Sequence, residues 1–130
     1  MIYTSYFRNL KNIPKNVVRI SICENSPDWY NGLHYTKLAP KYRLYREWKL
    51  IHDDQYYMNC FWSQVLSRLD VDEVYRELMA LSKNSDIVLL CYERPNIFSH
   101  RKIVSDWLNA GGYRVEEWSN KGEAIKWKTT

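Results

Sequence analysis

The sequence predicts a single α/β domain of the three-layer Rossmann-like type, with a mainly parallel sheet and helices on both faces. The run from Ile87 to Leu90 is wholly apolar, which is typical of a strand buried on both faces of a parallel sheet. Helical patterns precede and follow this run, as in a βαβ arrangement. A length of 130 residues with 45% hydrophobic content suits one compact domain, covering residues 1–130, rather than two.

Two segments near the start of the chain are rich in β-branched and aromatic residues, and we expect both to be strands. They are Ile2 to Tyr6 and Val17 to Cys23, separated by a polar loop that contains Pro14. A long loop is expected from Glu24 to Pro40, because turn-forming residues are dense there, and long ordered loops are usually functional. The aromatic cluster of this loop consists of Trp29, Tyr30, His34 and Tyr35.

Three helices are expected between this loop and the buried strand. Apolar residues recur at helical spacing from Lys41 to Asp53 and again from Tyr56 to Leu69. Asp70, followed three residues later by Glu73, is a candidate N-cap and capping box for the third helix. That helix leads directly into the buried strand.

The last part of the chain predicts a βαβ unit with parallel strands and a right-handed crossover. Ser99 is well placed as the N-cap of its helix, and the pair Gly111-Gly112 is expected to end that helix with a left-handed residue. A strand from Tyr113 to Trp118 follows, and Glu123 to Trp127 is a candidate edge strand.

Composition narrows the class of protein. The excess of 19 Lys and Arg over 15 Asp and Glu gives a net charge of +4, which favours anionic ligands but is small for a dedicated DNA-binding protein. Cys23, Cys60 and Cys91 are odd in number and form no CxxC pair, so we expect neither a disulfide framework nor a metal site. Without a signal-peptide pattern or a long apolar run, the expected location is the cytoplasm, with no membrane contact.

The main candidate site follows the buried strand, because open α/β sheets bind ligands beyond the carboxyl ends of their strands. With Ser99 as N-cap, His100 and Arg101 fall in the first helical turn, where amide hydrogens and the helix dipole favour an anion. We expect Ser99 and Arg101 to bind a phosphate or carboxylate, the alternative being that Arg101 pairs with Glu93. Glu93 and His100 are the candidates for acid–base or nucleophilic catalysis.

Other residues are weaker candidates for the same site. Cys91 is either a reactive thiol or an inert core side chain. Hydroxyl-bearing residues of the first strand reach this edge of the sheet if that strand is parallel and central. Aromatic residues near the same edge offer rings on which a base could stack. The remaining ligand-binding candidates are therefore Thr4, Ser5, Tyr6, Trp29, Tyr30 and Tyr92.

The spacing of the site resembles a known family. Cys91-x-Glu93, five residues, and then Ser99-His100-Arg101 is similar to the Cys-x-Glu…Cys-His-Arg signature of "domain of unknown function 488", a family of bacteria and their viruses. The similarity spans nearly the whole chain, from Tyr3-Thr-Ser-Tyr-Phe7 to Glu116-Glu-Trp118. The resemblance implies a compact α/β domain with its site at the end of the buried strand, and it implies no particular reaction.

One departure from the family signature concerns Ser99, which stands where the family commonly has its second cysteine. A mechanism that needs two thiols, such as disulfide exchange or a two-cysteine metal site, would have only Cys91 left. Serine caps a helix as well as or better than cysteine, so this departure favours anion binding.

Three functions follow from these observations. The first is a nucleotide- or nucleic-acid-processing enzyme, in which His100 and Arg101 bind phosphate and Glu93 acts in catalysis. The second is a binding module without chemistry that recognises or sequesters a phosphorylated small molecule or signalling nucleotide. The third is a nucleic-acid or protein contact through a basic surface, although such charges more often form a solvated helix face. That surface would comprise Lys37, Lys41, Arg43, Arg46 and Lys49.

Overall fold

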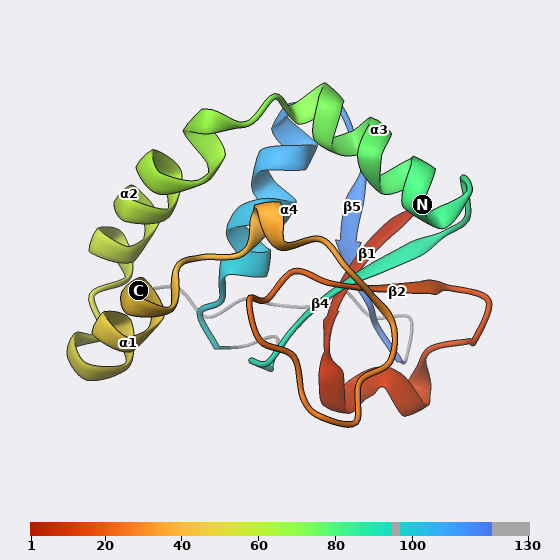
Figure 1. The fold of residues 1–130 in the computed structure, drawn as a ribbon, viewed down its shortest axis with the longest axis horizontal. Coiled ribbons are helices and arrows are strands. Elements are labelled where there is room, and N and C mark those ends of the chain that lie inside the picture. The colour runs from red at the N-terminus through yellow and green to blue at the C-terminus, as the bar shows by residue number, and fades with distance from the viewer. Residues whose placement is uncertain (95–96, 121–130) are drawn as a thin grey trace.

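A computed structural model describes residues 1–94 and 97–120, and within these residues the chain forms a five-stranded parallel sheet. The strand order is β3-β2-β4-β1-β5, with β4 in the centre (Figure 1). Every residue of β4 has an exposed fraction of 0%, which explains the unbroken apolar run. The expected α/β fold with a parallel sheet is therefore confirmed. The strands are β1 (Ile2–Tyr6), β2 (Val18–Ser21), β3 (Leu33–His34), β4 (Ile87–Cys91) and β5 (Val115–Glu117).

The two faces of the sheet are covered unequally. Because successive strand residues point to opposite faces, Ile87 and Leu89 pack on one side and Val88 and Leu90 on the other. The first side carries all the α-helices of the described residues, which arch over the sheet in Figure 1. They are α1 (Tyr42–Ile51), α2 (Asp54–Gln64), α3 (Val71–Ser82) and α4 (His100–Ala110).

The second side of the sheet is covered by a short 3-10 helix, η1 (Phe7–Asn12), and by neighbouring loops. Phe7, Ile13 and Val17 pack there against Val88 and Leu90. The helical layer on this face is thus thin, because the link between β1 and β2 is too short for a full crossover helix.

The helix boundaries agree with the sequence at α3 and differ at α2. The Asp70 carboxylate accepts hydrogen bonds from the amides of Asp72 (2.8 Å) and Glu73 (3.4 Å), which confirms the predicted N-cap. Helix α2 begins earlier than predicted, since Asp53 caps it by accepting from the Tyr56 amide at 3.0 Å. It also ends earlier, at Gln64, and the chain continues as the 3-10 helix η3 (Leu66–Arg68).

The predicted βαβ unit is present, with one change in strand order. Strand β5 is parallel to β4 but pairs with β1, which lies between them. Ser99 caps α4, and Gly112 supplies the left-handed residue after it, with φ of 97°. The candidate edge strand Glu123 to Trp127 lies outside the described residues.

The long loop after β2 contains short elements that the sequence did not indicate. Strand β3 pairs with β2 through Ile20 and Leu33, and a 3-10 helix, η2 (Thr36–Leu38), follows it. The chain then returns over the carboxyl ends of β2 and β4 before α1 begins. No helix in the described part of the chain is long and apolar enough to cross a membrane.

Candidate functional site

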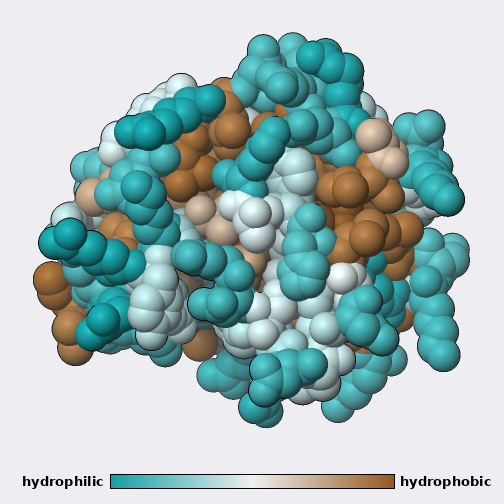
Figure 2. Space-filling model, viewed as in Figure 1, coloured by the Kyte–Doolittle hydropathy of each residue, from teal (hydrophilic) through white to brown (hydrophobic). Residues whose placement is uncertain are grey.

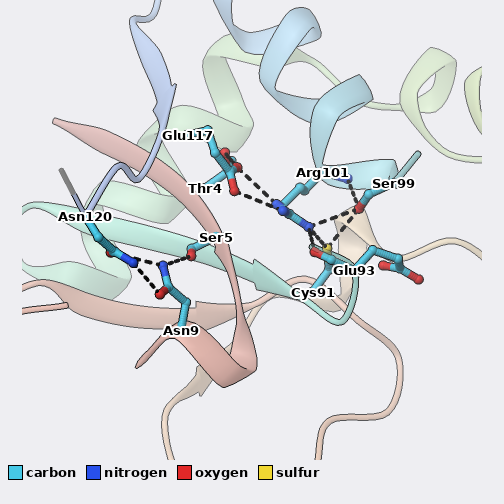
Figure 3. A network of polar contacts seen from close by, with 9 residues as sticks. All are labelled: Thr4, Ser5, Asn9, Cys91, Glu93, Ser99, Arg101, Glu117 and Asn120. Atoms are coloured by element: carbon cyan, nitrogen blue, oxygen red, sulfur yellow. Dashed lines mark hydrogen bonds and ion pairs between the residues drawn. The ribbon is translucent and has the colours of Figure 1, made fainter. Parts of the chain in front are cut away.

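Arg101 is the centre of a buried polar network at the start of α4 (Figure 3). Its exposed fraction is 0%, and its guanidinium makes two bonds to the Glu117 carboxylate, Nε to Oε1 at 3.0 Å and Nη2 to Oε2 at 2.9 Å. Thr4 donates a hydrogen bond to the same carboxylate at 2.6 Å. A buried charge is costly unless it is paired, so Glu117 is what makes the burial of Arg101 tolerable.

Glu93, the alternative partner considered for Arg101, contacts it through its backbone rather than its side chain. Arg101 Nη1 donates to the backbone carbonyl of Glu93, which fixes the chain just after β4. In Figure 3 the Glu93 side chain extends away from the guanidinium. The Glu93 carboxylate therefore takes no part in the ion pair between Arg101 and Glu117.

Cys91 lies beside Arg101 and Ser99 and is fully buried. Its sulfur is 2.9 Å from Ser99 Oγ and 2.8 Å from Arg101 Nη1. Burial raises the pKa of the Cys91 thiol, whereas the Arg101 guanidinium acts in the opposite direction. Burial has the larger effect, so the pKa is raised and the Cys91 thiol stays protonated, which makes it a poor nucleophile in this arrangement. A reactive Cys91 stays a prediction that this packing does not favour.

The start of α4 is occupied by protein groups. Ser99 and Arg101 are 3% and 0% exposed, and the Ser99 hydroxyl accepts from the Arg101 amide at 3.3 Å. The Cys91 sulfur lies against this helix end, in contact with the Ser99 hydroxyl and the Arg101 guanidinium. Direct binding of an anion by Ser99 and Arg101 stays a prediction, and this packing does not favour it.

An open cavity of about 270 Å³ lies next to the network, beyond the carboxyl ends of β2 and β4. A smaller hollow of about 10 Å³ shares Tyr45, Glu93 and His100 with it and extends to Ser99. Such a hollow is about large enough for one water molecule. The cavity is lined by Cys23, Glu24, Asn25, Pro40, Tyr42, Tyr45, Tyr92, Glu93 and His100.

His100 forms part of the cavity wall with most of its ring buried. Its Nε2 atom is 2.9 Å from the carbonyl oxygen of Ile22, and because a carbonyl only accepts, Nε2 carries the hydrogen and Nδ1 a lone pair. Burial lowers the pKa of His100 to about 4. The ring is therefore neutral at pH 7, and it offers a hydrogen-bond acceptor rather than a general acid.

The predicted aromatic residues divide between the cavity and the opposite face. Tyr92 lines the cavity, with its hydroxyl donating to the Asn25 carbonyl at 3.0 Å. Trp29 and Tyr30 pack edge-on against Phe7, at ring-centroid distances of 6.4 and 5.3 Å, and Tyr92 contacts the same ring at 4.9 Å. Neither Trp29 nor Tyr30 belongs to the cavity lining.

The predicted β1 residues also point in different directions. Thr4 contacts Glu117 on the helical side, whereas Ser5 accepts a hydrogen bond from Asn9 at 3.0 Å on the η1 side (Figure 3). The Arg101 guanidinium lies 5.8 Å from the centre of the Tyr6 ring. Thr4 and Tyr6 thus contact the buried network, and none of the predicted β1 residues lines the cavity.

Sequence reasoning missed several of the lining residues. Cys23, Glu24 and Asn25 follow β2 in the same way that Tyr92 and Glu93 follow β4, so the carboxyl-end rule applied to both strands would have found them. Tyr45 lies within the helix expected from Lys41 to Asp53, and no local signal distinguishes a tyrosine that packs from one that lines a cavity.

A second hollow, of about 510 Å³, lies between α1 and α2 and includes Trp48, Asp53 and Tyr57. The surface around it is apolar, since Leu50 and Ile51 are 82% and 69% exposed. Figure 2 shows brown side chains at the left edge of the molecule, where α1 lies. None of the residues predicted for the site lies in this hollow. No group of side chains suited to holding a metal ion occurs in residues 1–94 and 97–120.

The fold and the site define an α/β protein with a parallel sheet, a buried arginine network at the end of its central strand, and a tyrosine-lined cavity beside that network. The chain belongs to the DUF488 family, because residues 8–112 match the family DUF488-N3a, described as the active DUF488-N3 subclade. No curated protein and no solved structure matches the chain. The match confirms the resemblance seen in the sequence, and its description names no ligand or reaction.

Proposed function

We propose that this protein binds a nucleotide-like small molecule in the cavity beside β2 and β4. The observation that carries the proposal is the placement of Tyr42, Tyr45 and Tyr92 around one hollow beyond the carboxyl ends of parallel strands. Ligands of open α/β sheets bind at such positions, in pockets lined by aromatic side chains and a few polar groups.

The size of the cavity favours a small molecule over a polymer. Its volume of about 270 Å³ is close to the lower end of the range usual for small-ligand sites, about 300–1,000 Å³. Stacking of a base on an aromatic side chain contributes about 1–3 kcal/mol. The tyrosines would thus hold the heterocycle and leave the rest of the ligand outside.

The phosphate of such a ligand would lie at the rim of the cavity. Lys41 is positioned for it, between the lining residues Pro40 and Tyr42 at the start of α1. The Lys41 side chain does not cap α1 within the described structure, so the amides of the first turn lack a side-chain acceptor there. Helix starts of this kind favour an anion. In this arrangement Arg101 holds the site together rather than binding phosphate.

Acid–base chemistry is the second candidate function, and the position of Glu93 favours it. Arg101 fixes its backbone by donating to its carbonyl, and Glu93 is one of the residues that line the cavity. The substitution Glu93→Gln keeps the shape of the side chain but removes its charge. Turnover that disappears in this variant while nucleotide binding persists would support catalysis, whereas equal loss of both would identify Glu93 as a binding residue.

Calorimetric titration with AMP, GMP, CMP and UMP tests the proposal. We expect at least one nucleotide to bind, and Tyr92→Ala to weaken that binding by about 5- to 150-fold, the equivalent of one stacked ring. Trp29→Ala is the matched control, because Trp29 is 60% exposed and lies outside the cavity lining. Binding that survives Tyr92→Ala but is lost in Trp29→Ala would contradict the proposal.

A further inference from the structure

We infer that the heterocycle held in this cavity carries a positive charge, so that the ligand is a nucleotide with a quaternised aromatic nitrogen. This inference rests on the proposed function and specifies its ligand. It follows from the charges of the cavity wall, which are those of Glu24 and Glu93. No lysine or arginine occurs among the described lining residues, and His100 is neutral at pH 7 because burial lowers its pKa to about 4.

The acidic groups of the wall have few partners of their own. Glu24 is exposed and Glu93 is half-buried, and among the described residues no hydrogen bond to either carboxylate is seen. A neutral heterocycle rich in carbonyl groups would leave these oxygens facing other acceptors, and a phosphate would be repelled by them. A cationic ring would place a positive charge beside the carboxylates of Glu24 and Glu93.

The tyrosines of the wall are suited to the same kind of ligand. The Arg46 guanidinium already lies 5.8 Å from the centre of the Tyr42 ring, and Lys49 Nζ lies 5.5 Å from the centre of the Tyr45 ring. Each of these two rings therefore already has a cation of α1 over it, and Tyr92 is the ring of the wall that we expect a cationic ligand to contact. Tyr92 is held at the cavity by its hydrogen bond to the Asn25 carbonyl. Aromatic walls combined with acidic groups are a known way to bind quaternary nitrogen.

The oxidised and reduced forms of nicotinamide mononucleotide are a matched pair of probes. They share one skeleton, including ribose and phosphate, and differ by a hydride, so that only the oxidised ring carries a positive charge. Titration calorimetry at pH 8 would compare the two forms on the same protein. We expect the oxidised form to bind about tenfold more tightly than the reduced form.

Variants of the acidic residues test the physical reason for this preference. In the double variant Glu24→Gln/Glu93→Gln the cavity keeps its shape and loses its charge, so we expect the preference to fall to about threefold or less. Glu116→Gln is the control, because Glu116 lies on β5, pairs with the exposed Arg114 and does not line the cavity. It should leave the tenfold preference unchanged.

The outcomes separate this inference from the proposed function. If both forms bind equally, or the reduced form binds more tightly, the inference is overturned and the proposed nucleotide site stands. If AMP binds and neither nicotinamide form does, the inference is again overturned. If no nucleotide binds at all, both the inference and the proposed function are overturned.

Discussion

Arg101 and Glu117 form a two-bond ion pair in which both side chains are almost completely buried, at 0% and 3% exposure. The pair joins the first turn of α4 to β5, the edge strand next to β1. Through Nη1 the same guanidinium reaches the Cys91 sulfur and the Glu93 carbonyl. Arg101, a residue of the motif that resembles the family signature, therefore connects the end of the central strand to the rest of the sheet.

Replacement of Arg101 should be strongly destabilising. Arg101→Met leaves the Glu117 carboxylate buried without its partner, so we expect the free energy of unfolding to fall by about 3–5 kcal/mol in urea titrations. The double variant Arg101→Met/Glu117→Leu should lose less than the sum of the single variants, because it removes both charges. Arg114→Ala, at an exposed pair, serves as the control and should change stability by less than about 1 kcal/mol. A small effect of Arg101→Met would contradict the importance of this pair.

Stability should decrease as the pH falls from neutral, because of His100. Burial lowers its pKa to about 4 in the folded protein, from 6.5 for an unperturbed histidine. Between these values the unfolded chain binds a proton that the folded protein does not, so the stabilisation is complete above pH 6.5 and is lost as the pH falls towards 4. Unfolding measured at pH 7 and pH 5 should differ by about 2 kcal/mol through this group. His100→Asn should remove that part of the difference, and an unchanged slope in the variant would count against a buried neutral His100.

Thiol labelling should distinguish the cysteines. Cys91 is fully buried and Cys23 is 8% exposed, and burial raises the pKa of both thiols, whereas Cys60 is partly exposed. Iodoacetamide should therefore modify Cys60 first in the folded protein and the other two only after unfolding. Peptide mass spectrometry identifies the modified site. Early modification of Cys91 would instead show that its sulfur is reachable and reactive.

Ser99→Ala should weaken the start of α4. The variant removes the hydroxyl that accepts from the Arg101 amide and contacts the Cys91 sulfur, and loss of an N-cap costs about 0.5–2 kcal/mol. Ser105→Ala on the same helix is a suitable comparison, because the Ser105 hydroxyl accepts a single long bond from Asn109 at 3.5 Å. Thermal unfolding should show a larger decrease for Ser99→Ala than for Ser105→Ala. Equal decreases would mean that the cap contributes little.

The strands that could be predicted were those with a strong local pattern. The apolar run of β4 follows from its burial on both faces, and β1 was recognised from its β-branched and aromatic residues. Strand β3 could not be recognised, because Leu33 and His34 are both exposed and are extended only through pairing with β2. Tertiary contact, rather than local preference, determines such a strand.

The partners of the residues predicted for the candidate site could not be predicted from the sequence. Arg101 was expected to bind an anion, with the nearby Glu93 as its alternative partner, but its side chain pairs with Glu117, which becomes a neighbour because β5 lies beside β1 with Thr4 opposite Glu117. Sequence spacing contains no information about this register. The cavity likewise depends on Tyr42, which the long loop after β2 brings over the sheet. No short sequence motif predicts the path of that loop.

The most direct test of nucleotide binding in this cavity is a titration of ¹⁵N-labelled protein followed by NMR. Addition of the nucleotide that binds most tightly in calorimetry should shift the backbone amides of Tyr92, Glu93 and Tyr45, which line the cavity. Amides of Tyr56 and Ile51, beside the hollow between α1 and α2, should shift little. Large shifts confined to that second hollow, or none in the cavity lining, would contradict the proposed site.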